Sequence, residues 1–548
     1  MDKLLGRHTA FESCLFQAAQ SSILPYCTLI CPCIAFKIFR LALNEWTSPL
    51  RNIRGPPNPS FFYGNQRQLF EAENTVTEEK WIEEYGSTFK YTGFFGSNAL
   101  YVADTKAVNH ILTETHVYQK PSWLQYIFIR ILGAGLVVVE GDKHQKQACR
   151  RRIMNPAFGS PQIRDLTGIF VEKAVELRDI WLEESMRNKE ANSRIDVLAW
   201  LRKLTLDVIG LAGFGYKFDA LKTDSNELHQ AFSTIFRSAN RVNPHQLLRG
   251  FFPFLRPILE RLPDRQDVAA QNAIKNANRI GNELMRSSEA ALMMHDSNGK
   301  AEKNSWKGRD LLSLLLRANL ATDLPPSQRM SDEEVMDRAL STTWALFALA
   351  QYPDIQEKLR RELLSVKTDY PSFDELNALP YLDMFVRESL RLLGPVVATT
   401  RVAVQDSVLP LGKPIQGKDG KVLHEILIRK GDNVHIPVLM INSDKEIWGE
   451  DAATFRPARW QNIPEAASAI PGVWGHLLTF IGGPRACIGF RFALAEMKAL
   501  LFTLVRAFEF ELAVPVADIK SSGQRPSLRS EPSVGVQMPL KLEAFQHN

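Results

Sequence analysis

The chain has 548 residues, well above the ~150 of a typical single domain, and 45% of them are hydrophobic, so it can bury a large core. Lys and Arg number 66 and Asp and Glu 61, and this net charge of +5 is too small to indicate a nucleic-acid partner. The six cysteines are too sparse for a disulfide framework, which indicates a reduced, cytosol-facing body.

The first hydrophobic stretch predicts a membrane anchor. Residues 23–43 have about the 20-residue length that a membrane span needs, but their uninterrupted apolar part ends at Phe36. Lys37, Arg40, Arg51 and Arg54 follow that part, and Glu45 is the only acidic residue among them. This charge asymmetry places the C-terminal side in the cytosol. A tilted span and a half-embedded anchor both remain open, and a cleaved signal peptide is disfavoured because no A-x-A-like site follows. Residues 1–22 form a tail before the anchor.

A proline-rich stretch follows, and residues 44–60 are predicted to be a stiff hinge between the anchor and the body, residues 61–548. Helical spacing is expected at residues 81–85 and nearly throughout residues 163–294. Alternating apolar residues at 88–102 predict a hairpin of strands.

Several later segments also have simple structural interpretations. The apolar residues 121–141 fit a core helix, and the polar residues 295–309 fit a loop. Residues 251–258 are rich in Phe and Pro, and they fit either a helix–helix contact or a substrate entrance that dips into a membrane. The alternation at residues 408–437, with a turn at Asp419-Gly420, predicts a small sheet, and residues 530–542 predict a final hairpin.

A helix is expected to begin after Ser331. Ser331 and Glu334 form a capping-box pattern, and the helical spacing continues to Gln351, before Pro353. Its 20 residues would span ~30 Å.

A run near the C-terminus, residues 480–489 (FIGGPRACIG), carries the clearest chemical pattern. A Gly-Gly-Pro turn is predicted to place Cys487 at the N-terminus of a long apolar helix. The positive end of the helix dipole favours a thiolate, which is a soft metal ligand. Phe480 can shield the sulfur, Arg485 can meet a carboxylate of the same ligand, and the glycines allow a flat ligand to approach closely.

This run resembles the haem-ligand loop of the cytochrome P450 superfamily, F-x-x-G-x-R-x-C-x-G. It matches every defined position of that pattern, which are Phe480, Gly483, Arg485, Cys487 and Gly489. The resemblance implies a mainly α-helical fold with a smaller β part (α+β), haem b as cofactor and Cys487 as the iron ligand. A thiolate ligand favours O–O bond cleavage at haem iron.

The resemblance also assigns further residues. Glu388 and Arg391 on one helix face, with Arg459 from the segment FRPARW, would form a buried charge cluster that fixes the cysteine loop. Arg401 and His144 would hold haem propionates. In the family, the residue at the position of His144 is followed one helical turn later by an Arg that also holds a propionate. Here Ala148 stands one turn after His144, as though Ala148-Cys149-Arg150 were inserted. Arg151 is therefore the candidate for the role of that Arg. Residues 121–141 match the family's mobile region over the substrate pocket.

The predicted central helix departs from the family. Its A-G-x-[DE]-T groove is absent, and the nearest run is residues 339–343 (ALSTT), with Leu340 in place of the Gly. Thr342 and Thr343 are the candidate catalytic residues for proton delivery, although a solvated or back-bonded polar patch is the simpler interpretation. Either the gene model lost coding sequence here, which we favour, or the protein is impaired in oxygen activation.

The resemblance implies a fungal-type monooxygenase that receives electrons from NADPH through NADPH-cytochrome P450 reductase. The expected substrate is lipophilic, a terpenoid or other secondary metabolite, and the expected location is the endoplasmic reticulum membrane with the catalytic domain facing the cytosol. Two alternatives remain open: a haem-thiolate isomerase or dehydratase that does not use dioxygen, and a non-functional membrane-anchored product of a defective gene model.

Overall fold

The computed structural model describes residues 46–71, 73, 75–132, 138, 140, 151, 154–187, 194–223, 227, 230–231, 234, 244–261, 265–298, 332–522 and 524–545. The predicted anchor at residues 23–43 therefore lies outside the described residues. Within them, no helix combines the length and the hydropathy that a membrane crossing requires.

The described chain is mainly helical. Its helices are α2 (Gln66–Glu71), α3 (Val76–Tyr85), α4 (Thr105–Thr113), α5 (Ser122–Leu132), α7 (Ser160–Arg187), α8 (Val197–Phe214), α10 (Pro244–Phe251), α11 (Arg256–Leu259), α12 (Arg265–Asn298), α14 (Asp332–Gln351), α15 (Pro353–Leu364), α16 (Phe373–Asn377), α17 (Pro380–Leu392), α18 (Val438–Asn442), α19 (Lys445–Trp448) and α20 (Phe490–Ala507).

The strands form four small sheets. They are β1 (Thr88–Thr92), β2 (Asn98–Val102), β3 (Tyr118–Gln119), β4 (Arg194–Asp196), β5 (Thr399–Ala403), β6 (Ser407–Gln416), β7 (Val422–Ile428), β8 (Asn433–Ile436), β9 (Phe508–Leu512), β10 (Ile519–Ser522), β11 (Arg525–Leu528) and β12 (Pro539–Ala544). The five-stranded sheet has the order β1-β2-β8-β5-β3, and the others are β4-β12-β9, β6-β7 and β10-β11. The expected class, mainly α with a smaller β part, agrees with this arrangement.

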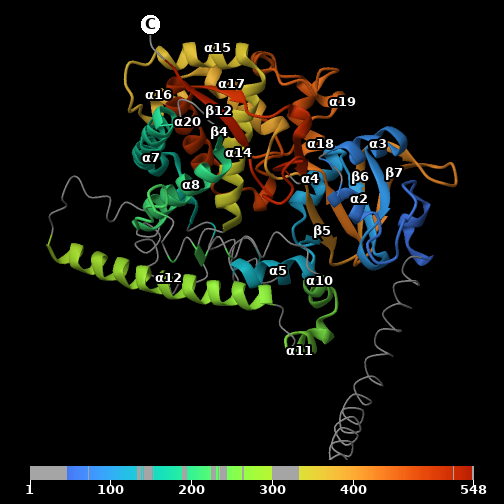
Figure 1. Cartoon of the computed structure of the whole chain (residues 1–548). Helices are drawn as coiled ribbons and strands as arrows, with labels where there is room; N and C mark the ends of the chain where they lie inside the picture. The colour runs from blue at the N-terminus through green and yellow to red at the C-terminus, as the bar shows by residue number, and fades with distance from the viewer. Residues whose placement is uncertain are drawn as a thin grey trace, which may run out of the picture.

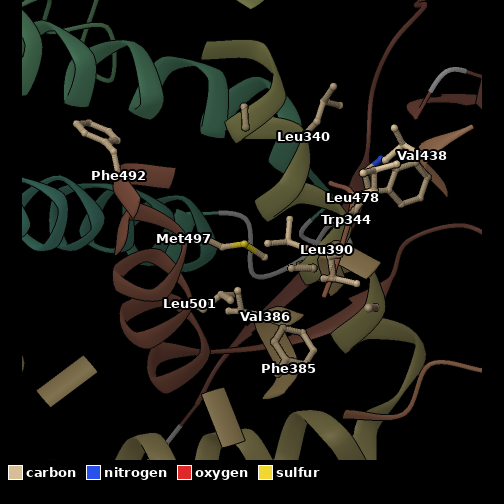
Figure 2. Packing of buried hydrophobic residues seen from close by; sticks show 14 of the residues in the cluster. Leu340, Trp344, Phe385, Val386, Leu390, Val438, Leu478, Phe492, Met497 and Leu501 are labelled. Atoms are coloured by element: carbon tan, nitrogen blue, oxygen red, sulfur yellow. The ribbon is translucent and has the colours of Figure 1, made fainter. Parts of the chain in front are cut away.

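The core lies where α14, α17 and α20 meet, and Figure 1 shows these helices together in the body. Each helix contributes an apolar face because its apolar residues recur at helical spacing. Figure 2 shows Trp344 of α14, Leu390 of α17 and Met497 of α20 in the same packing, and all three are buried. α20, which follows the cysteine loop, is therefore held in place by its packing against α14 and α17.

The expected hairpin at residues 88–102 is confirmed, because β1 and β2 pair antiparallel. The turn at Asp419-Gly420 is also confirmed, since it connects the paired strands β6 and β7 and Gly420 has a φ of +80°. Within the predicted hinge, Leu50 and Ile53 are buried against the body.

Three sequence predictions were wrong. The tail at residues 530–542 forms no hairpin; its strand β12 pairs with β4 and β9, and the hairpin is β10–β11. The predicted loop at residues 295–309 begins too early, because α12 continues to Asn298. The apolar helix α5 is also not a core helix, since Ile129 is exposed and residues 123–128 are only half-buried.

Candidate functional site

Cys487 lies in a short loop between a 3₁₀ turn at Gly483–Arg485 and α20. Gly489 is the N-cap residue of α20, so Cys487 precedes the first helical residue by three positions. The Cys487 N–H donates to the Phe480 carbonyl at 2.9 Å, which closes the loop. The sulfur is thus carried close to a helix N-terminus, where a thiolate is favoured.

Two glycines let this loop pass close to neighbouring backbone. A Cβ on Gly482 would lie 1.6 Å from the Pro471 carbonyl oxygen, and one on Gly483 would lie 2.7 Å from the Leu112 carbonyl oxygen. Gly483 also has a φ of +70°, which side chains disfavour. The loop is therefore pressed against α4. At Gly489 a Cβ would meet only the Phe158 ring, at 3.9 Å.

The Phe480 ring lies among other rings beside the loop. Its centroid is 5.9 Å from that of Trp474 and 6.0 Å from that of Phe490. These rings form a partly buried apolar side of the loop.

A second group of charges lies next to the loop. The Arg485 guanidinium donates to the carbonyls of Tyr118 at 2.7 Å and Thr115 at 3.0 Å, and it also pairs with the Glu140 carboxylate. Arg401 is buried and donates to the Thr399 hydroxyl at 2.7 Å. Burial, together with the nearby Arg485 charge, lowers the pKa of Arg401 to about 10, and Glu140 opposes this shift.

Sequence reasoning missed two members of this group, Glu140 and Lys120. The Lys120 Nζ atom lies 3.9 Å from a Glu140 oxygen, and the backbone N–H of Lys120 donates to the same carboxylate. Arg401, Arg485 and Lys120 are positive and Glu140 is negative, so the four charges sum to +2. The sequence does contain one signal for Glu140, because it is a single acidic residue directly after the apolar run of residues 135–139.

Arg151 contacts the cysteine loop from another side. It donates to the Pro484 carbonyl at 2.7 Å and to the Ala486 carbonyl. Burial lowers the pKa of Arg151, while the negative charge of Cys487 opposes the shift. The structure thus brings Arg151 to the loop itself. His144 and the triplet 148–150 lie outside the described residues.

The three residues Glu388, Arg391 and Arg459 form a fully buried cluster. Arg391 donates to Glu388 through Nε at 2.9 Å and through Nη2 at 2.8 Å, a bidentate pair. The Arg459 Nε atom lies 3.5 Å from Glu388. Trp460, which sequence reasoning did not include, donates its indole N–H to Glu388 at 3.0 Å.

On α14, Leu340, Thr342 and Thr343 are all buried. The Thr343 hydroxyl donates to the Ala339 carbonyl at 2.7 Å, so the back-bonded interpretation is confirmed for Thr343 and the solvated one is wrong. The reason is that α14 packs against α8 and α20 instead of facing water.

This donor set fits the thiolate-facing side of a haem. One cysteine lies close to a helix N-terminus, aromatic rings lie beside its loop, and the adjoining charges carry an excess of +2. Since two propionates carry a charge of −2, equal in size and opposite in sign, the carboxylates of a bound haem would neutralise this excess.

Comparison with known proteins agrees with this geometry. The family model described as Cytochrome P450 matches residues 54–535. The chain is 49% identical to Cytochrome P450 monooxygenase 205 of Postia placenta, an alignment that covers 93% of this chain and 96% of the relative. It is 34% identical to Cytochrome P450 monooxygenase claP of Ampulloclitocybe clavipes, with 92% and 95% covered. The chain therefore belongs to the cytochrome P450 family of monooxygenases, which are oxidoreductases.

Proposed function

We propose that this cytochrome P450 binds haem b through Cys487 and inserts one oxygen atom of dioxygen into a lipophilic small molecule, with NADPH-cytochrome P450 reductase supplying the electrons. Membership of the family implies a haem, a reductase partner and a small-molecule substrate. The observation that carries the proposal is the position of Cys487 at the N-terminus of α20, beside a buried cationic group. A thiolate-ligated haem supplies the oxygen activation.

The protein's own residues then have separate tasks. Cys487 binds the iron as a thiolate. Arg401, Arg485 and Lys120 are proposed to neutralise the haem propionates, which their shared proximity to Glu140 and the cysteine loop supports, and Arg151 holds the loop backbone. His144 is proposed as a further propionate ligand on the resemblance alone.

The cluster of Glu388, Arg391 and Arg459 is proposed to hold the cysteine loop in place. Phe480, Gly483 and Gly489 are proposed to shield the sulfur and to leave room for the flat ligand. For proton delivery, Thr342 and Thr343 remain the candidates on α14, although the Thr343 hydroxyl is engaged by Ala339.

We also propose that the catalytic domain faces the cytosol at the endoplasmic reticulum membrane. Trp123 of α5 stacks on Phe251 of α10 with centroids 5.3 Å apart, which makes residues 251–258 partly a helix contact. Beyond that contact, Phe254 and Ile258 are exposed. Exposed apolar side chains of this kind favour a lipid surface, and a terpenoid or other secondary metabolite dissolved there would be a suitable substrate.

A second candidate function has a specific observation in its favour. Leu340 is buried where the family's oxygen groove has a Gly, and the neighbouring Thr343 hydroxyl is engaged. A haem-thiolate isomerase or dehydratase needs no such groove. A product of a defective gene model that binds no haem is the third possibility.

One experiment separates the three. Reduced full-length protein is treated with carbon monoxide, and then NADPH consumption is measured with the reductase present. A thiolate-type carbonyl band with NADPH consumption supports the monooxygenase. The band without consumption supports the isomerase or dehydratase, and a protein that takes up no haem supports the third possibility.

A further inference from the structure

Two buried polar side chains, Asn442 at the end of α18 and Thr479 before the cysteine loop, face each other. The Asn442 Nδ2 atom donates to the Thr479 hydroxyl oxygen at 2.9 Å, and the Leu478 N–H donates to Asn442 Oδ1 at 2.9 Å. Asn442 has no exposed surface and Thr479 has 5%. We call this pair the Asn442–Thr479 link.

The link is bonded at both ends to elements already described. On one side Arg391 of the buried charge cluster donates to the Asn442 carbonyl at 3.0 Å. On the other side the Thr479 hydroxyl donates to the Leu390 carbonyl at 2.8 Å. The residue after Thr479 is Phe480, whose carbonyl accepts the Cys487 N–H. Hydrogen bonds and one peptide unit thus connect Arg391 to Cys487.

The surroundings of the link leave little freedom to rearrange. Figure 2 shows Leu390, Val438 and Leu478 packed in one apolar region, and all three are buried. A Cβ on Gly394 would lie 3.1 Å from the Thr479 methyl group, so Thr479 is also fixed by close packing. In such a region an unpaired donor or acceptor is unfavourable, which favours the single bonded arrangement.

We propose that Asn442 and Thr479 are positioning residues. They connect the rigid Glu388–Arg391 cluster to the cysteine loop and thereby fix the position of the Cys487 sulfur. The link itself is a property of the protein alone. Its consequence for iron ligation rests on the proposed function.

The chain offers a matched set of variants. Thr479→Val keeps the shape and removes both hydrogen bonds of the hydroxyl, whereas Thr479→Ser keeps them. Asn442→Leu removes the other partner. Thr167→Val is the control, because Thr167 is an equally buried threonine whose hydroxyl donates at 2.8 Å only to Ile163 of its own helix, α7.

The first measurement is hydrogen exchange of the peptide spanning residues 478–487 in the full-length protein as purified. Losing the link should speed exchange there about tenfold, the factor that corresponds to ~1.4 kcal/mol, in Thr479→Val and Asn442→Leu. Thr479→Ser and Thr167→Val should exchange like the wild type. Thr479→Val is the deciding variant, because Val has nearly the same shape as Thr. The test therefore remains valid even where Asn442→Leu does not fold.

The second measurement is the carbonyl spectrum of the reduced haem-loaded proteins. Thr479→Val should shift part of the thiolate-type band to the form with a lost or protonated sulfur, and Thr479→Ser should not. Unchanged exchange in Thr479→Val, or an equal change in Thr167→Val, overturns the proposal. If the wild type takes up no haem while exchange still separates the variants, the proposed function fails and the link stands.

Discussion

Glu388 is a fully buried carboxylate, and several donors converge on it. Besides Arg391, the indole of Trp460 and the backbone N–H of Arg456 donate to it, at 3.0 and 2.9 Å. A charge in this position is tolerated only because its partners compensate the lost hydration. Removing the charge would leave the buried guanidinium of Arg391 without its anion.

Glu388→Gln should therefore lower the free energy of unfolding by about 3–5 kcal/mol or abolish soluble expression. Chemical denaturation of purified full-length protein measures the loss. Glu357→Gln is the control, because Glu357 pairs with Arg361 at 2.6 Å on an exposed helix face. That variant should lose at most about 0.5 kcal/mol. Equal losses in the two variants would show that the cluster does not stabilise the fold.

The sequence predicted the three charged residues of this cluster but missed Glu140, which lies beside the cysteine loop. Glu388 and Arg391 are three residues apart, so the helix itself brings them to one face, and the pattern sufficed. Glu140 meets Arg485 across 345 residues of chain, and no local spacing reports such a contact. Arg151 was expected at a propionate, and the structure adds its bonds to the loop carbonyls, which depend on the approach of two distant segments.

At the scale of the elements, α17 and α20 are joined by a partly buried ion pair. The Lys498 Nζ atom lies 2.8 Å from Asp383, and Arg387 approaches the same carboxylate at 2.6 Å. Burial by itself raises the pKa of Asp383, but the two cations outweigh it and hold the pKa below its usual value of 3.8. The ionised carboxylate therefore stabilises the fold.

Asp383→Asn should cost about 1 kcal/mol of unfolding free energy near neutral pH. Because the folded-state pKa is depressed, this contribution is full above the ordinary carboxyl value and is lost as the pH falls through the lower folded-state value. Urea denaturation at a series of pH values should show the gap between wild type and variant closing below pH 3.8. A gap that is constant down to the acid transition would contradict the assignment.

Long, strongly periodic elements could be predicted, and short ones in long-range sheets could not. α14 follows from its helical spacing, and β1 and β2 follow from alternation before and after a short turn. The tail alternates just as well, but β12 pairs with β9 and β4, which come from other parts of the chain. Alternation fixes the faces of a strand and not its partner.

For the molecule as a whole, we propose that Phe254 and Ile258 belong to the surface that faces the membrane. Phe254 and Ile258 of the segment after α10 are 38% and 36% exposed. Figure 1 shows α10 and α11 together with α5 at one end of the body. Replacing both residues by Ser should lower binding of the haem domain, residues 46–548, to phospholipid vesicles several-fold, because less apolar surface is buried in lipid.

Vesicle co-sedimentation measures this binding. The control is the double variant Val422→Ser and Leu427→Ser, since both residues are exposed on β7, in the two-stranded sheet β6–β7. If the control loses as much binding as the Phe254 and Ile258 variant, the membrane face has been misassigned.

The length of the alignments bears on the departure in the central helix. The match to Cytochrome P450 monooxygenase 205 spans 533 positions, whereas 93% of the 548 residues here is about 510, so that relative has about 23 residues without a counterpart. The match to Cytochrome P450 monooxygenase 128 of Postia placenta spans 526 positions and 92% of this chain, which is about 504 residues and a deficit of about 22. We propose that a coding segment was lost before or within α14, which would account for both deficits.

Transcript sequencing across residues 338–344 and the preceding segment should therefore find additional in-frame sequence, and the native protein should exceed 62.0 kDa by the mass of about 20 residues. The triplet 148–150 should be absent from the same transcript. Intact-mass spectrometry of protein from the native source checks both. A native mass equal to that of the present sequence would show that the short α14 is real and would favour the isomerase or dehydratase.

The most direct measurement is the visible spectrum of the reduced, carbon monoxide-treated full-length protein, compared with Cys487→Ser. The wild type should show a pigment with a thiolate-type carbonyl band, and this one substitution should abolish the band completely. An unchanged band in Cys487→Ser would contradict it, because no other described residue offers a thiolate to the iron.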